Sequence, residues 1–191
     1  YAAKQSSGGS SIYRSNDGGI SWSTINNGMS GNRYRPLIAV TPENPNVIYA
    51  VFSSSDYSFH ALYKSSDAGD SWVMKSDTPN ILGRDTDGTS TGGQSWYDLS
   101  LGVATNNENL VYVGGINLWK SNDGGSTWLV DGSSGNGANY SYMHVDQHCF
   151  EFNPHSHVAY AGNDGGFYKY MENLNSWVDI SDGLEITQFY N

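Results

Sequence analysis

One short motif occurs three times in this chain and limits what the chain can fold into. The motif Ser-x-Asp-x-Gly-x-Ser/Thr-Trp occupies residues 15–22, 65–72 and 121–128. A degenerate fourth copy at 163–166 is followed by Trp177, and the four tryptophans are 50, 56 and 49 residues apart. A regular spacing of about 50 residues indicates a repeat architecture in which each unit is one supersecondary structure.

The segments around each motif have the pattern of short strands. Each of the first three motifs follows an apolar residue, an aromatic residue and a base, at 12–14, 62–64 and 118–120. Apolar segments flank short polar turns at 41–46, 105–109 and 153–157. Four antiparallel strands in a unit of this length are typical of a propeller blade. The sequence therefore predicts an all-β fold, a β-propeller built from four-stranded antiparallel blades.

The strand pattern gives about four blade equivalents over residues 1–191. The expected blade parts, followed by the first strand of a next blade, are 1–32, 33–80, 94–131, 144–182 and 183–191. Two arrangements fit this count. The last strand can pair with the first to close a four-bladed ring, or the segment can belong to a larger ring.

The repeated motif has the chemistry of a turn that satisfies its own polar groups. The aspartate accepts backbone N–H bonds within the turn, the glycine adopts a positive φ, and the tryptophan covers the turn with an apolar face. We therefore expect a structural role, in preference to a catalytic or calcium-binding one, for Asp17, Gly19, Trp22, Asp67, Gly69, Trp72, Asp123, Gly125, Trp128, Asp164 and Gly166.

This motif resembles the Asp box, or bacterial-neuraminidase repeat. The resemblance implies a β-propeller of the sialidase, sortilin or xyloglucanase type, with the boxes away from the active face. The succession of segments 93–99, 113–120, 144–148, 162–166 and 183–190 is similar to that of large secreted propellers from bacteria with type IX secretion. Those proteins are many hundreds of residues long. The resemblance therefore favours a larger ring, continuous with further blades and other domains, outside the cell or on its outer surface.

Composition excludes several classes of partner. The net charge is −10 with only nine Lys and Arg residues, so the chain has no basic surface for nucleic acid. Its apolar runs are much shorter than the ~18–20 residues of a membrane span, so we expect no direct membrane insertion. Cys149 is the only cysteine, and its apolar neighbours predict a buried strand residue.

Strand alternation predicts which face carries function. In each blade the first-to-second and third-to-fourth turns share one face, and the other connections share the opposite face. The opposite face has the long connections, at 53–60, 76–95 and 131–143, and long loops on a rigid scaffold are where binding usually occurs. We expect ligand binding there by Trp96, Tyr97, Tyr140, Tyr142 and His144.

Asp98 and Asp146 occupy equivalent places, eight residues before Asn106 and Pro154 in neighbouring units. Packed sheets lie ~10 Å apart, and inverting glycosidases separate their two carboxyl groups by ~6.5–9.5 Å. The spacing permits a catalytic acid–base pair. The favoured alternative is that both aspartates accept backbone N–H bonds around the central channel.

His144, Asp146 and His148 alternate along the chain. If this stretch is extended, all three side chains point the same way and can bind zinc or another divalent cation. The favoured alternative is a polar ring along the channel, and no other cofactor is expected. Asp85 begins a calcium-like sequence at 85–88, but Trp96 stands where a calcium loop needs glutamate, so a solvated turn is expected.

Two functions follow from these residues. The first is a non-catalytic module that binds polysaccharide or protein at the cell surface. The alternative is a xyloglucanase-like inverting glycoside hydrolase that uses Asp98 and Asp146. A sialidase is disfavoured, because recognition of the sialic acid carboxylate needs an arginine cluster and only Arg33, Arg35 and Arg84 are candidates.

Overall fold

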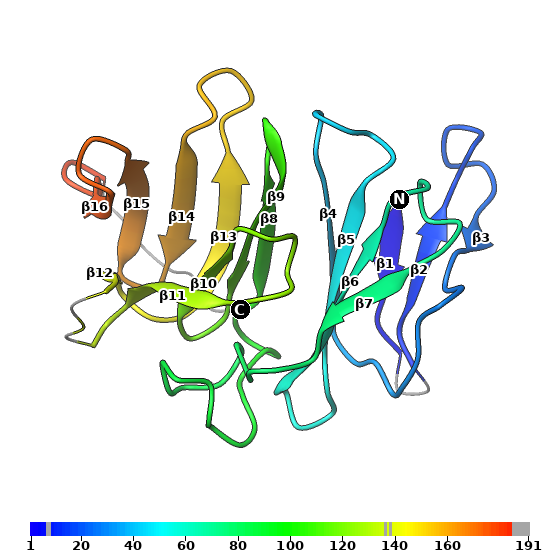
Figure 1. Cartoon of the computed structure of the whole chain (residues 1–191), viewed down its shortest axis with the longest axis horizontal. Helices are drawn as coiled ribbons and strands as arrows, with labels where there is room; N and C mark the ends of the chain where they lie inside the picture. Colours follow the sequence, from blue (N-terminus) through cyan, green and yellow to red (C-terminus); the bar gives the residue numbers. More distant parts are fainter. Residues whose placement is uncertain (7–8, 136, 138, 185–191) are drawn as a thin grey trace.

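The structure is a computed structural model that describes residues 1–6, 9–135, 137 and 139–184. The described chain is all-β and forms four sheets that stand side by side like the blades of a fan (Figure 1). In the described residues, no helix is long and apolar enough to cross a membrane. The all-β propeller architecture expected from the repeat is confirmed.

The strands follow each other in chain order within each sheet. The first sheet has three strands, β1 (Ala2–Lys4), β2 (Ser11–Arg14) and β3 (Ser23–Thr24). The second has β4 (Pro36–Val40), β5 (Ile48–Ser53), β6 (Phe59–Ser65) and β7 (Val73–Ser76). The third has β8 (Ser100–Ala104), β9 (Asn107–Gly114), β10 (Leu118–Ser121), β11 (Leu129–Ser133) and β12 (Ser141–Tyr142). The fourth has β13 (Gln147–Phe152), β14 (Ala159–Asn163), β15 (Gly166–Met171) and β16 (Ser176–Asp179).

One detail of the strand count exceeds the prediction, and another lies outside the part of the chain that the structure describes. The third sheet has a fifth strand, because β12 pairs in parallel with β11 through Gly132 and Ser141. Ser141 also accepts a hydrogen bond from the backbone N–H of Trp177, so β12 connects the third sheet to the fourth. The further strand expected at 183–191 lies almost entirely outside the described residues.

The hydrophobic core consists of three clusters, one between each pair of neighbouring sheets. β5 shows how one strand serves two of them. Ile48, Ala50 and Phe52 pack toward the first sheet, whereas Tyr49 and Val51 pack toward the third. Successive side chains of a strand point to opposite faces, so every residue of β5 is buried. This continuous apolar strand is the local sequence signal of an inner blade.

Three tryptophans each connect their own sheet to the preceding one by a hydrogen bond. The indole Nε1 of Trp72 donates to Ile25 O at 2.6 Å, and that of Trp128 donates to Ser76 Oγ at 2.9 Å. Trp177 repeats this contact from the fourth sheet, with Asp131 Oδ2 at 2.7 Å. Trp22 has no preceding sheet among the described residues and is 46% exposed.

The three repeated turns have the hydrogen bonds expected of them. In the second, Asp67 Oδ1 accepts from Ser71 N and Ser65 Oγ, and Oδ2 accepts from Ser71 Oγ. These bonds lower the pKa of Asp67 to about 2, with the Ser71 hydroxyl as the largest cause. Gly69 has a φ of 95°, and a Cβ there would collide with the Ile25 side chain. The turn therefore needs glycine both for its conformation and for its close approach to the neighbouring sheet.

The prediction of a fourth turn of this kind is wrong. Asp164 lies between β14 and β15 and Gly166 begins β15, so both belong to a second-to-third strand connection. The third-to-fourth strand turn of this sheet is a short connection at 172–175. Asp164 therefore lies at the edge of its sheet opposite to the edge that carries Asp17, Asp67 and Asp123 in the other sheets.

Cys149 is exposed, contrary to the prediction of a buried strand residue. Phe150 and Phe152 of β13 face the core between the third and fourth sheets. Cys149 alternates with them and so faces away from that core.

Candidate functional site

The long connections gather along one edge of the fan, the lower edge in Figure 1. The connection from β7 to β8 and the segments around β12 lie there, together with the β14–β15 turn. The short turns 41–47 and 153–158 lie at the opposite, upper edge (Figure 1). We call the lower edge the loop edge.

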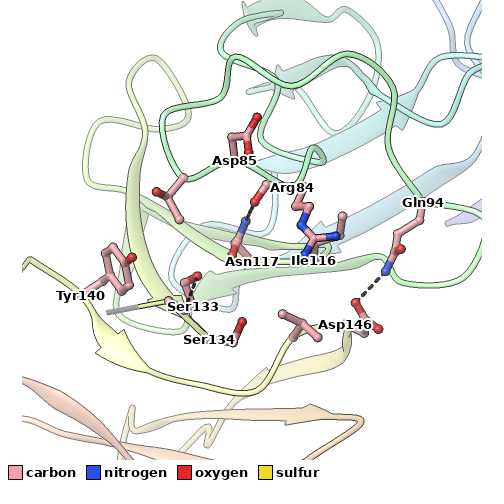
Figure 2. Close-up of a pocket in the computed structure, with 12 residues that line it drawn as sticks. Arg84, Asp85, Gln94, Ile116, Asn117, Ser133, Ser134, Tyr140 and Asp146 are labelled. Carbon is pink, nitrogen blue, oxygen red and sulfur yellow. Dashed lines mark hydrogen bonds between the residues drawn. The ribbon is translucent and has the colours of Figure 1, made fainter. Parts of the chain in front are cut away.

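A pocket of about 520 Å³ opens at the loop edge between the third sheet and its flanking connections (Figure 2). We call it the loop-edge pocket. Three segments line it. The β7–β8 connection contributes Arg84 and Gln94, the β9–β10 turn contributes Asn117, and the segment between β11 and β13 contributes Tyr140 and Asp146, among others. Most of these side chains are polar.

Hydrogen bonds hold the long connection that forms one wall of this pocket. The Asn80 amide Nδ2 donates to Ser90 O and Gly92 O, and its Oδ1 accepts from Phe59 N. Asn117 Nδ2 donates to Arg84 O at 2.9 Å and so ties the β9–β10 turn to this connection. These bonds order the wall without regular secondary structure.

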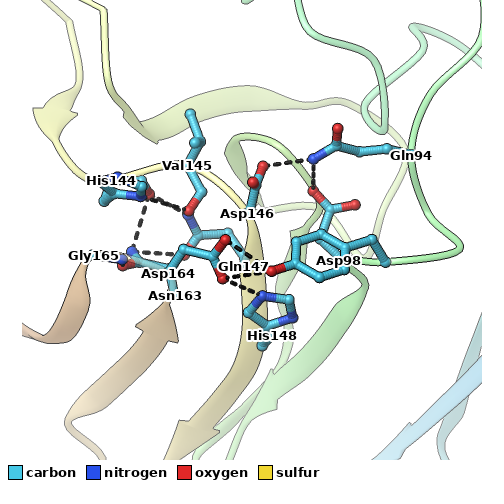
Figure 3. Close-up of polar contacts among 11 residues, drawn as sticks. Gln94, Asp98, His144, Val145, Asp146, Gln147, His148, Asn163, Asp164 and Gly165 are labelled. Atoms are coloured by element: carbon cyan, nitrogen blue, oxygen red, sulfur yellow. Dashed lines mark hydrogen bonds and ion pairs between the residues drawn. The ribbon is translucent and has the colours of Figure 1, made fainter. Parts of the chain in front are cut away.

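Asp98 and Asp146 do come together, as their equivalent positions suggested, and Gln94 joins them (Figure 3). Gln94 Nε2 is 2.9 Å from Asp98 Oδ2 and 2.6 Å from Asp146 Oδ1. Asp98 is fully buried. Burial raises the pKa of Asp98 to about 7; the hydrogen bond from Gln94 opposes this shift and the charge of Asp146 adds to it.

The separation of these two carboxyl groups does not fit an inverting glycosidase. Both oxygens contact the same nitrogen, so they lie closer together than the ~6.5–9.5 Å that leaves room for a water molecule in that mechanism. Asp98 is also fully buried and does not line the pocket, whereas Asp146 does. The favoured alternative, in which both carboxylates accept backbone N–H bonds around the channel, leaves out the Gln94 side chain that contacts both of them.

A second polar cluster lies beside this pair and centres on Asp164 (Figure 3). His148 Nε2 is 2.6 Å from Asp164 Oδ1, and the Tyr97 hydroxyl donates to Asp164 Oδ2 at 2.9 Å. The Tyr97 and His148 rings meet edge to face with centroids 4.8 Å apart. The sequence does not reveal this role of Asp164, because Asn-Asp-Gly-Gly also matches the repeated turn.

The predicted metal triad is not assembled. His144 Nδ1 contacts Val145 O, Asp146 bonds to Gln94, and His148 bonds to Asp164. The stretch is not extended, because Asp146 has a φ of 66° and the register of β13 shifts between Gln147 and Cys149. Among the described residues, no group of three His, Cys, Asp or Glu side chains is placed to hold a metal ion.

The calcium-like sequence at 85–88 forms a turn. Asp87 Oδ1 accepts hydrogen bonds from the backbone and hydroxyl of Thr89, and Gly88 N donates to Asp85 O. Asp85 lines the loop-edge pocket. The sequence thus builds part of the pocket wall.

The predicted ligand-binding residues are spread over the loop edge. Tyr140 lines the loop-edge pocket. Trp96 and Tyr142 are 61% and 63% exposed and do not line it. Tyr97 is engaged with Asp164, and the His144 backbone carbonyl accepts bonds from Gln147 and Asn163.

The arginines do not form the cluster that a sialidase needs. Arg33 Nε donates to Ser10 O, and Arg35 donates to Ser95 O. Arg84 lines the loop-edge pocket without either of them. Gln94 and Asn117, which shape the pocket, carried no sequence signal of their own, because isolated amide residues are common in loops.

Comparison with known proteins supports the fold. No protein-family model matches the chain. A xyloglucanase from Paenibacillus sp. is 24% identical in an alignment 189 residues long, which covers 89% of this chain and 18% of that protein. The chain thus spans less than a fifth of the curated relative it matches.

Solved structures resemble the chain more broadly. The GH74 xyloglucanase from Xanthomonas campestris matches 92% of this chain and 27% of its own, with a TM-score of 0.59 and 17% identity. An ancestral GH74 enzyme matches 93% of this chain and 22% of its own, with a TM-score of 0.57 and 19% identity. YCF48 bound to D1 peptide matches 88% of this chain and 47% of its own, with a TM-score of 0.54 and 13% identity.

These similarities and the four radial sheets define the class of protein. The chain has the fold of a β-propeller segment. At these identities the likeness establishes the fold alone, and function has to be argued from the site.

Proposed function

We propose that this chain is a segment of a secreted or cell-surface β-propeller that binds polysaccharide at its loop edge without catalysing a reaction. The loop-edge pocket is the observation that carries the proposal: about 520 Å³ of space lies between ordered connections. A hollow among long loops on a rigid scaffold is a common place for a ligand.

The chemistry of the pocket suits a sugar chain. Tyr140 offers an aromatic face, and Gln94 and Asn117 offer amide groups at the same pocket. Aromatic rings pack against apolar ligand surfaces, and amides both donate and accept hydrogen bonds, as sugar hydroxyl groups require. The relative named a xyloglucanase supports a polysaccharide ligand.

The burial of Asp98 supports binding over hydrolysis. A general acid or base must come within hydrogen-bond reach of the group that it protonates or deprotonates. Asp98 is fully buried, so a ligand in the loop-edge pocket meets Asp146 but not Asp98.

A glycoside hydrolase is the second candidate, because the pocket carries two carboxylates of its own, Asp85 and Asp146. Glycosidases use two such groups on either side of the bond they cleave. The test is reducing-sugar release from xyloglucan, β-glucans and pectin, with Asp146→Asn as the variant. Release that disappears in Asp146→Asn would replace the binding proposal by hydrolysis.

We also propose that the segment belongs to a larger ring. Trp72, Trp128 and Trp177 are each covered by the preceding sheet, whereas Trp22 is 46% exposed. A further blade in front of the first sheet would cover Trp22 in the same way. The assignment of the repeated turns to Asp boxes, and an outer-surface location reached by type IX secretion, rest on the sequence resemblance.

Calorimetric titration with xyloglucan, cellulose and pectin oligosaccharides tests the binding proposal. Tyr140→Ala should weaken binding by about fivefold to tenfold, because an aromatic contact contributes about 1 kcal/mol. Tyr142→Ala is the matched control, since Tyr142 is exposed and does not line the pocket. Equal loss in both variants, or saturable binding only of a protein or peptide, would contradict the proposal.

A further inference from the structure

The fully buried carboxyl group of Asp98 shares the Gln94 amide with Asp146, a carboxylate of the loop-edge pocket. We propose that Asp98 is a positioning residue whose protonated form, together with Gln94, fixes the Asp146 carboxylate for a ligand. The inference rests on the proposed function, because it takes the loop-edge pocket as the binding site.

The surroundings of Asp98 do not suit an ionised carboxylate. Its Oδ2 accepts one hydrogen bond, from Gln94, and its Oδ1 is buried with no hydrogen-bond partner in the described part of the chain. A carboxylate has about four acceptor positions, and an unpaired buried charge is costly.

Two charged groups act on Asp98, in opposite directions. Asp146 is close enough to raise the pKa of Asp98 by its charge. Arg35 acts on Asp98 electrostatically, but its Nη1 donates to Ser95 O and it forms no ion pair in the described residues. With a negative neighbour and no paired cation, the neutral form of Asp98 is favoured.

Protonation of Asp98 also fits the way in which the two carboxyl groups share the Gln94 amide. The Gln94 amide nitrogen has two N–H groups, one for each carboxyl group. A proton on Asp98 makes it a hydrogen-bond donor within reach of Asp146. Asp146 then carries the only negative charge of the pair, and both of its neighbours hold it by hydrogen bonds.

The backbone of Asp146 is fixed as well. Its N–H donates to Ile116 O at 3.2 Å, and the next N–H, of Gln147, donates to Gly115 O at 2.8 Å. Its φ of 66° is uncommon for a residue other than glycine. A side chain held on both sides in an uncommon backbone conformation is positioned for contact with a ligand.

Substitutions at Asp98 separate a positioning role from a charged one. Asparagine has the shape of protonated aspartate, accepts from Gln94 and donates toward Asp146. Asp98→Asn should therefore bind a xyloglucan oligosaccharide within about twofold of the unchanged chain, whereas Asp98→Ala and Gln94→Ala should each lose about tenfold. Gln94 also lines the pocket, so Gln94→Ala tests the bridge through its effect on the titration of Asp98, which remains measurable even if Asp98→Ala does not fold. Asp182→Asn, an exposed acid, is the control.

The protonation state is measured separately, in the ligand-free protein. The ¹³C chemical shift of the Asp98 carboxyl carbon should titrate near neutral pH and respond to Gln94→Ala. Titration at an ordinary aspartate pKa, or loss of binding in Asp98→Asn equal to that in Asp98→Ala, would overturn the inference. Absence of oligosaccharide binding in the unchanged chain would defeat the proposed function alone, because the ¹³C titration still decides the state of Asp98.

Discussion

Aspartates in this chain have opposite pKa shifts, depending on how many donors surround them. Asp123 accepts from Ser121, Ser126 and Thr127, and its pKa falls to about 2. Asp98 accepts from Gln94 in a buried place, and its pKa rises to about 7. The first aspartate stabilises a turn as an anion, whereas the second fits its site as a neutral acid.

The raised pKa of Asp98 predicts how stability changes with pH. An acid with an unfolded pKa of 3.8 and a folded pKa of about 7 favours the folded state most below pH ~4. That contribution, up to about 4 kcal/mol, is lost as the pH rises to about 7. Asp98→Asn cannot ionise, so it should match the unchanged chain near pH 4 and exceed its Tm by roughly 10 °C at pH 8.

Thermal unfolding of both proteins from pH 4 to pH 8 measures this difference. Asp182→Asn, an exposed acid without the burial of Asp98, should show no such divergence. Parallel Tm curves for Asp98→Asn and the unchanged chain would show that Asp98 ionises normally in the folded state.

The turn aspartates predict a different result. Asp123→Ala removes the acceptor for four hydrogen bonds inside one turn. The expected loss of unfolding free energy is roughly 1–3 kcal/mol, which urea denaturation measures. Asp87→Ala is the control, since within the described ranges the Asp87 side chain accepts two hydrogen bonds, both from Thr89. A cost for Asp123→Ala no larger than that control would mean that the turn does not depend on its carboxylate.

At the scale of the element, the same motif has different energetic weight in different sheets. Trp128 is buried between the second and third sheets, and its indole N–H bonds to Ser76. Trp22 has the same place in the first repeat but is half exposed and bonds to Gly19 of its own turn. The two copies share the motif Ser-Asn-Asp-Gly-Gly-x-Ser/Thr-Trp, so the difference comes from the neighbouring sheet.

This contrast predicts unequal costs for one substitution. Trp128→Ala should lower the free energy of unfolding by roughly 3–5 kcal/mol, as expected for a buried tryptophan. Trp22→Ala, the matched change, should cost about 1 kcal/mol or less, because little area is lost from the core. Chemical denaturation of the two variants measures both values. Similar costs would contradict the view that the covering sheet makes the difference.

At the scale of the whole molecule, the four sheets are held by three interfaces of one kind. Each uses alternate residues of an inner strand, as β5 and β9 show, and a tryptophan from the following sheet. Nothing in this scheme limits the number of sheets. The proposed larger ring therefore needs no new kind of contact.

The larger ring predicts a change at Trp22. In a longer protein with a blade in front of the first sheet, Trp22 should be covered like Trp72. Acrylamide quenching of its fluorescence should fall from that of an exposed indole to that of a buried one. A chain in which the other tryptophans are replaced by phenylalanine isolates the Trp22 signal. Unchanged quenching in the longer protein would contradict the proposed neighbour.

Local patterns in the chain determined much of this structure before any contact was known. The repeated turns at 15–22, 65–72 and 121–128 could be predicted because each satisfies its hydrogen bonds within a few residues. The strand β5 could be predicted from the apolar segment that follows the polar turn at 41–46. Such features depend on neighbours along the chain, so composition and spacing are enough to find them.

The site was decided by tertiary structure. The position of Asp164 depends on which two strands its turn joins, and Asn-Asp-Gly-Gly suits either connection. The separation of His144, Asp146 and His148 depends on one left-handed residue and one register shift. Gln94 meets Asp146 across 52 positions of sequence. Spacing along the chain predicts none of these three arrangements. The packing of the sheets determines which side chains are in contact and that Asp98 is the buried carboxyl group.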